Sequence, residues 1–101
     1  MTGNWFINKT REVIEAWNKD KITQSKDLIK INSDKTYTCT NKIFADGKWE
    51  INEGKMILYP SNYTNGKYVL SILDKKQESV TLFLSNKNNA VDVEYYFYLT
   101  K

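Results

Sequence analysis

The fold class is decided by the stretch Thr36-Tyr-Thr-Cys-Thr-Asn-Lys-Ile-Phe44 and by the turn that follows it. Tyr37, Cys39 and Ile43 share one face of this stretch, while threonine and lysine side chains share the other. This is the period of a half-buried β-strand and not that of a helix. Ala45-Asp-Gly47 then indicates a tight turn, because Asp-Gly is a strong hairpin signal. The stretch therefore predicts an antiparallel hairpin.

The same alternation, closed by turn residues, extends over the rest of the chain. The candidate strands are Asn4–Asn8, Arg11–Trp17, Lys26–Asn32, Thr36–Phe44, Lys48–Asn52, Lys55–Tyr59, Lys67–Leu73, Val80–Leu84 and Val91–Leu99. Turn signals recur every 8–12 residues, and no helix-length segment separates the strands in most of the chain. The pattern predicts an all-β fold, an antiparallel up-and-down meander that closes into an eight-stranded, or nine-stranded, barrel.

The segment Thr10–Lys21 fits two structures. Val13, Ile14 and Trp17 have the spacing of a helical stripe, whereas Val13, Glu15 and Trp17 would share one side of a strand. We favour the strand, because consecutive neighbouring strands give the simpler topology.

Composition limits the classes of protein to which the chain can belong. Its 101 residues, 41% of them hydrophobic and 14% aromatic, predict a single domain over residues 1–101. The net charge of +3 is interspersed, with no basic run of the kind that binds nucleic acid. No apolar stretch approaches the roughly 20 residues of a transmembrane helix. We expect a cytoplasmic protein if Met1 is native, or a cell-envelope or periplasmic one if a leader precedes it.

Most catalytic and metal chemistries lack their usual residues. The chain has no histidine, one cysteine and four scattered glycines, so we expect no catalytic residue, no metal ligand and no cofactor. Glu50 with Glu53, and Asp92 with Glu94, are the carboxylate pairs, and both fit a solvated strand face. The sequence predicts a protein that is not an enzyme.

Inward-facing positions give the candidate ligand-binding residues. They are Ile31, Tyr37, Cys39, Trp49, Ile51, Leu70, Ile72, Leu82, Tyr95 and Phe97. An eight-stranded barrel is just wide enough to be filled by its own side chains or to hold one small ligand. Both outcomes stay open for this set.

Several tyrosines break the alternation and would face outward. Tyr59, Tyr63, Tyr96 and Tyr98 are candidates for a surface that binds a protein partner or a second copy of the chain. The alternative is that the Thr10–Lys21 segment covers them, with Ile14 and Trp17 as its contact face.

Short motifs along nearly the whole chain resemble the small bacterial lipocalin-like domains of the calycin superfamily. They are Gly3-Asn-Trp5, Ile31-Asn-Ser-Asp-Lys-Thr-Tyr37, Gly47-Lys-Trp-Glu-Ile51 and Lys55-Met-Ile-Leu58. The resemblance implies a barrel that binds a small apolar ligand, such as a lipid, at one open end. The alternative function is a protein–protein interaction module of the inhibitor or immunity type, with a filled barrel.

The resemblance also implies a plug at the closed end of the barrel. Trp5 would fill that end, Gly3 would allow close approach, and a basic side chain would stack over the indole ring. Arg11 and Lys101 are the candidates for this side chain. The hairpin motif departs from the family, because Lys35 stands where the family usually has glycine.

Overall fold

The computed structural model describes residues 2–40, 44–61, 66–88 and 91–101. Its strands are β1 (Gly3–Ile14), β2 (Lys19–Ile31), β3 (Thr36–Cys39), β4 (Gly47–Asn52), β5 (Lys55–Pro60), β6 (Tyr68–Lys75), β7 (Ser79–Asn88) and β8 (Val91–Thr100). They form one closed antiparallel barrel in sequence order, with β8 pairing back onto β1. The predicted all-β, up-and-down, eight-stranded barrel is therefore confirmed.

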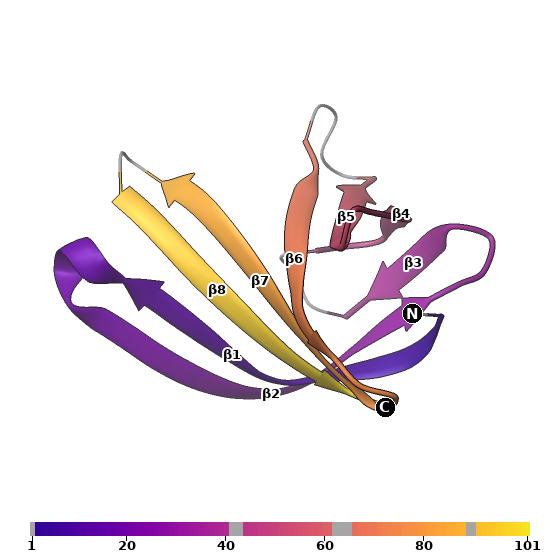
Figure 1. Ribbon diagram of the computed structural model, residues 1–101, viewed down its shortest axis with the longest axis horizontal. Coiled ribbons are helices and arrows are strands. Elements are labelled where there is room, and N and C mark those ends of the chain that lie inside the picture. Colours follow the sequence, from indigo (N-terminus) through magenta and orange to yellow (C-terminus); the bar gives the residue numbers. More distant parts are fainter. Residues whose placement is uncertain (1, 41–43, 62–65, 89–90) are drawn as a thin grey trace.

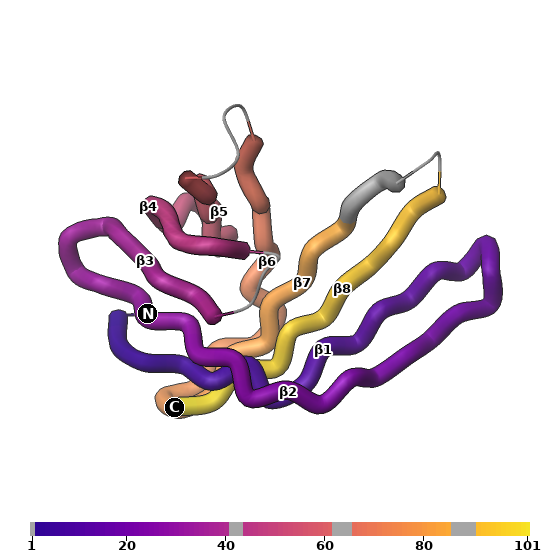
Figure 2. Tube along the Cα trace, turned by 180° about the vertical axis from the view of Figure 1, so that it is seen from behind, coloured from indigo at the N-terminus to yellow at the C-terminus, as the bar shows by residue number. Residues whose placement is uncertain are grey.

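The barrel is closed tightly at one end and splayed at the other. Strands β1, β2, β7 and β8 form one wall that leans away from β3–β6, as both views show (Figures 1 and 2). The pairing explains the shape, because β2 pairs with β3 only through Ile29–Ile31. Strand β6 pairs with β7 only through residues 71–75. The two walls thus share backbone hydrogen bonds near one end alone.

The ambiguous Thr10–Lys21 segment forms the far end of a long hairpin. Strand β1 continues to Ile14, a 3₁₀ turn spans Glu15–Trp17, and β2 begins at Lys19. Asn18 takes a left-handed conformation (φ 51°), which asparagine tolerates better than most residues. The preference for a strand is correct as far as Ile14. Because β1 is continuous, two of the nine candidate strands merge into one.

Other described turns also use left-handed residues, among them Ala45 (φ 52°) between β3 and β4. Glu53 (φ 51°) and Gly54 (φ 75°) join β4 to β5, as a type I′ hairpin turn requires. Lys35 has φ 72°, in the left-handed region that favours glycine. The lysine side chain then reaches Trp49, with its Nζ 4.4 Å from the ring centre. This cation–π contact offsets part of the backbone cost.

The hydrophobic core lies at the closed end. Trp5, Phe97, Met56, Leu70 and Tyr37 are each at most 2% exposed. The buried polar groups are satisfied: the Tyr37 hydroxyl donates to the Phe44 carbonyl at 2.7 Å. In the part of the chain that the structure describes, no buried side-chain nitrogen or oxygen lacks a partner.

Candidate functional site

Most of the ten residues expected to line the interior belong to one packed core. Those buried in the core cluster are Ile31, Tyr37, Trp49, Leu70, Leu82 and Phe97. Cys39, Ile72 and Tyr95 are partly buried and pack against it. The Phe44 and Phe97 rings meet edge to face at 4.9 Å, which is the geometry of a filled core. The structure brings these residues together, and their side chains pack against one another as a core.

Ile51 is the exception among the ten, and its placement in the interior is wrong. It is 43% exposed, although Trp49 two positions earlier is 6% exposed. Ile51 pairs with the fully buried Met56, so it has the inward direction that the alternation predicts. It lies one residue before the end of β4, beyond Gly47 and Lys48, where β3 pairs with β4. Alternation predicts the face of a strand but not the depth at which a residue lies.

Of the two candidate cations for the predicted plug, Lys101 lies over the Trp5 ring. Trp5 is 2% exposed, and Lys101 Nζ lies 5.1 Å from its ring centre. A Cβ on Gly3 would lie 3.8 Å from the Lys101 side chain, and Gly3 has φ 119°, which favours glycine. Arg11 as the plug residue is wrong. It lies opposite Tyr96 on the outer face and pairs with Asp20 instead.

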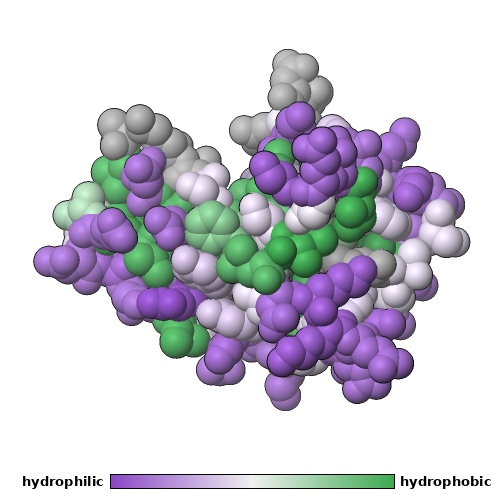
Figure 3. Space-filling view, in the orientation of Figure 1, coloured by the Kyte–Doolittle hydropathy of each residue, from purple (hydrophilic) through white to green (hydrophobic). Residues whose placement is uncertain are grey.

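A polar hollow of about 270 Å³ lies on the inner face of the β1–β2–β8 wall. Its lining residues are Thr10, Glu12, Lys21, Thr23, Ser25, Asp27 and Tyr95. Thr10 pairs with Phe97 and Glu12 pairs with Tyr95, so these side chains point to the same side as the core. The molecular surface dips between the two walls (Figure 3). Of the ten predicted interior residues, Tyr95 lines this hollow.

Glu12 is the ionised centre of the hollow. Its carboxylate lies 2.6 Å from Lys19 Nζ and is 26% exposed. The hydrogen bond from Lys19, assisted by one from Tyr95, holds the pKa of Glu12 below its usual value. Burial first, and then the hydrogen bond to Glu12, raise the pKa of Tyr95. The hollow therefore contains a fixed carboxylate beside a neutral phenol.

Ser25 and Asp27 hold the floor of the hollow in place. The Ser25 hydroxyl donates to the Ile7 carbonyl where β1 and β2 are out of regular register. Asp27 accepts a hydrogen bond from Thr40 at 3.2 Å, which ties β2 to the residue after β3. Sequence reasoning missed these polar residues. The available signal was that the inward positions of Lys19–Ser25 are all polar, unlike those of the other strands.

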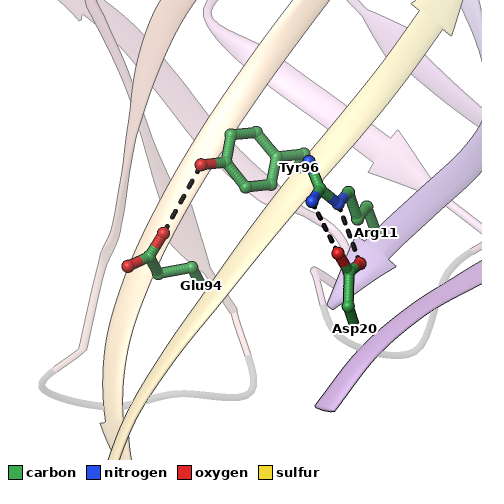
Figure 4. A network of polar contacts seen from close by, with 4 residues as sticks. All are labelled: Arg11, Asp20, Glu94 and Tyr96. Atoms are coloured by element: carbon green, nitrogen blue, oxygen red, sulfur yellow. Dashed lines mark hydrogen bonds and ion pairs between the residues drawn. The ribbon is translucent and has the colours of Figure 1, made fainter. Parts of the chain in front are cut away.

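The outer face of the same wall carries two of the four predicted surface tyrosines. Tyr96 contacts Phe83, with ring centres 5.0 Å apart, and the Arg11 guanidinium lies 5.6 Å from the Tyr96 ring centre. Lys9 Nζ lies 4.7 Å from the ring of Tyr98. Figure 4 shows Arg11 between the Tyr96 ring and Asp20, with the Tyr96 hydroxyl directed to Glu94. Cations from β1 thus cover part of both rings.

The predicted tyrosine set does not form one surface. Tyr59 lies on β5, which two strands separate from β8, and its hydroxyl donates to Glu50. Tyr63 lies outside the described residues. The expectation that Ile14 and Trp17 cover Tyr96 and Tyr98 is also wrong. Ile14 is buried, Trp17 is 63% exposed, and β1 lies beside the tyrosines because it pairs directly with β8.

A second hollow, of about 280 Å³, lies beside the 3₁₀ turn. Its lining includes the carboxylates of Glu15, Asp92 and Glu94. Within residues 2–40, 44–61, 66–88 and 91–101, no group of three or more acidic or cysteine side chains is arranged to hold a metal ion. Glu15 and Asp92 are exposed, so this hollow offers a ligand little buried surface.

Among the described residues, no helix is long and apolar enough to cross a membrane. Comparison of the chain with family models, with curated proteins and with solved structures gave no match.

Proposed function

We propose that the chain is a binding module, a lipocalin-like barrel that takes a small ligand in its open half and catalyses no reaction. The polar hollow on the inner face of β1, β2 and β8 is the observation that carries this proposal. Its volume of about 270 Å³ is close to the lower end of the range typical of ligand pockets, about 300 Å³. The closed end, with Lys101 over Trp5, supports the lipocalin-like arrangement.

The chemistry of the hollow favours a ligand with both an apolar face and hydrogen-bond donors. The apolar ligand expected from the sequence would need the space that Phe97, Leu70 and their neighbours occupy. In the hollow, the Tyr95 ring offers an apolar surface and the Glu12 carboxylate accepts hydrogen bonds. We therefore propose a small hydroxyl- or amine-bearing molecule as the ligand.

Replacing Glu12 by glutamine should weaken the binding of such a ligand about 10- to 100-fold, because a hydrogen bond to a charged group contributes about 1.5–3 kcal/mol. A panel of amino alcohols, amino sugars and polyols, with fatty acids alongside, can be screened by the rise in melting temperature on binding. Compounds that stabilise the native protein are then titrated into Glu12→Gln.

The matched control is Glu94→Gln, which makes the same change on the outer face of β8. Binding should be retained there. The proposal fails if no amine or polyol raises the melting temperature, or if Glu12→Gln and Glu94→Gln bind equally well.

A protein-interaction module is the second candidate function. The observation that favours it is the Phe83–Tyr96–Arg11 arrangement on the outer face, because tyrosine and arginine are enriched at protein interfaces. Tyr96 and Tyr98 are only partly exposed, which leaves this surface smaller than the sequence predicts.

A further inference from the structure

In the part of the chain that the structure describes, strand β2 has one long edge without a neighbouring strand. It pairs with β1 along its length but with β3 only from Ile29 to Ile31. Within the described residues, no strand pairs with the other edge of β2 between Lys19 and Lys26. In Figure 1, β2 is the outermost strand of its wall. Free backbone N–H and C=O groups on such an edge can pair with another strand.

The charge pattern of this edge is complementary to itself. The segment reads Lys19-Asp-Lys-Ile-Thr-Gln-Ser-Lys-Asp27. A two-fold axis perpendicular to the sheet at Thr23 pairs the segment with a second copy in antiparallel orientation. Asp20 then lies opposite the partner's Lys26, and Lys19 lies opposite the partner's Asp27. Every charged pair in this register joins opposite charges.

Neighbouring registers are less favourable. A two-fold axis perpendicular to the sheet keeps the outer faces of both copies on the same side. Side chains that lie opposite each other must then share a face, so the axis passes through a residue that pairs with the same residue of the partner. Centring the pair on Lys21 opposes two lysines, and centring it on Ile22 joins no opposite charges. Centring it on Gln24 joins Lys21 to Asp27 but places neither Asp20 nor Lys26 opposite a charge. Lysines on an edge strand commonly oppose unwanted pairing. Here Lys21 disfavours one register, while the register centred on Thr23 stays open.

Of the two charged pairs, Asp20 with Lys26 is accessible on the outer face, whereas Lys19 and Asp27 lie on the inner face and contact Glu12 and Thr40 of their own chain. The Asp20 side chain is 51% exposed and holds Arg11 through two hydrogen bonds, of 2.6 and 2.9 Å. Lys26 is exposed and forms no salt bridge within the described part of the chain. In the dimer, Asp20 would lie between Arg11 of its own chain and Lys26 of the second copy.

An exposed apolar side chain lies next to the same axis. Ile22 is 54% exposed on the outer face of β2. In the register centred on Thr23 it lies opposite the partner's Gln24 and diagonal to the partner's Ile22. Diagonal neighbours across two strands are within reach of long side chains. Pairing would therefore cover two isoleucines that the single chain leaves in water.

From the free edge, its charge pattern and Ile22, we propose that two copies of this chain associate through β2. They form an antiparallel, two-fold symmetric pair centred on Thr23. The test of this proposal is distinct from that of ligand binding, because it changes Asp20 and Lys26, which do not line the polar hollow, and it measures mass in the absence of ligand.

Sedimentation velocity over a broad range of protein concentration tests this pairing. The measured mass of the native protein should rise from 11.9 kDa towards twice that value. Lys26→Glu should weaken the dimer about tenfold or more, a change of about 1.4 kcal/mol, because it places like charges opposite each other at two symmetric positions. Lys30→Glu is the matched control: Lys30 is exposed on the outer face of β2, where β3 already covers the edge.

A mixing experiment makes the test specific to the register. Asp20→Lys places two cations opposite each other in its own dimer, so its dimer should be weakened as that of Lys26→Glu is. An equimolar mixture of Asp20→Lys and Lys26→Glu restores opposite charges at both positions and should form a heterodimer. Circular dichroism checks that each variant is folded. A native protein that is monomeric throughout, a dimer unaffected by Lys26→Glu, equal weakening by Lys30→Glu, or a mixture that stays monomeric would each overturn the proposal.

Discussion

Replacing Trp5 by alanine should lower the free energy of unfolding by about 3–5 kcal/mol, which is the usual cost of truncating a buried tryptophan. Trp5 is 2% exposed at the closed end, where β1 pairs with β2. Its removal would leave a cavity at the closed end of the barrel, where the buried core cluster includes Trp5. Lys101 would lose the ring over which its ammonium lies. Urea denaturation followed by circular dichroism measures the effect.

Phe6→Ala is the control for this prediction. Phe6 is the next residue of β1 and is 44% exposed, because it faces outward. Its truncation should cost about 1 kcal/mol or less, as for most substitutions on the surface. Equal losses at Trp5 and Phe6 would contradict the inward and outward assignment of β1.

Gly47→Ala should destabilise the barrel by about 3 kcal/mol or more, because overpacking a dense region forces the backbone to shift. A Cβ at this position would lie 2.0 Å from the Tyr59 carbonyl oxygen and 2.9 Å from the Pro60 Cα. Both neighbours are backbone atoms of β5 and cannot rotate away. The same denaturation measurement applies.

Gly54→Ala gives the comparison. Gly54 has φ 75°, but a Cβ there would meet no atom within 4 Å. The expected cost is about 1–2 kcal/mol from the left-handed backbone alone. If Gly54→Ala proves more destabilising than Gly47→Ala, the close approach of β4 to β5 is not as described.

The sequence was informative about the fold because alternation acts locally. Trp49, Phe97 and Leu70 face inward as predicted, and the turn at Glu53-Gly54 lies between the predicted strands Lys48–Asn52 and Lys55–Tyr59. Two features depend on long-range pairing and were not predictable. Ile51 has the correct face but lies at an exposed strand end. The joining of Asn4–Asn8 to Arg11–Trp17 needed the register shift between Ile7 and Lys9.

The candidate site was harder to predict than the core. A search for apolar inward positions cannot find Glu12 or Thr23, because both are polar. Glu12 also lies in the Thr10–Lys21 segment, which fitted a helix as well as a strand. Their inward direction follows from the pairing of Glu12 with Tyr95 and Thr23 with Thr10. Tyr95 was found from its alternation within β8. Arg11 was assigned to the plug because it is the only arginine, while the register places it beside Tyr96.

The most direct test of ligand binding in the polar hollow is a two-dimensional ¹H–¹⁵N NMR titration of the labelled protein. The probes are the amino alcohols, amino sugars and polyols that raise its melting temperature. We expect the largest shift changes at residues that line the hollow, among them Thr10, Glu12 and Thr23. Changes centred instead on Tyr96 and Tyr98 of the outer face, or no changes with any of these compounds, would contradict the proposal.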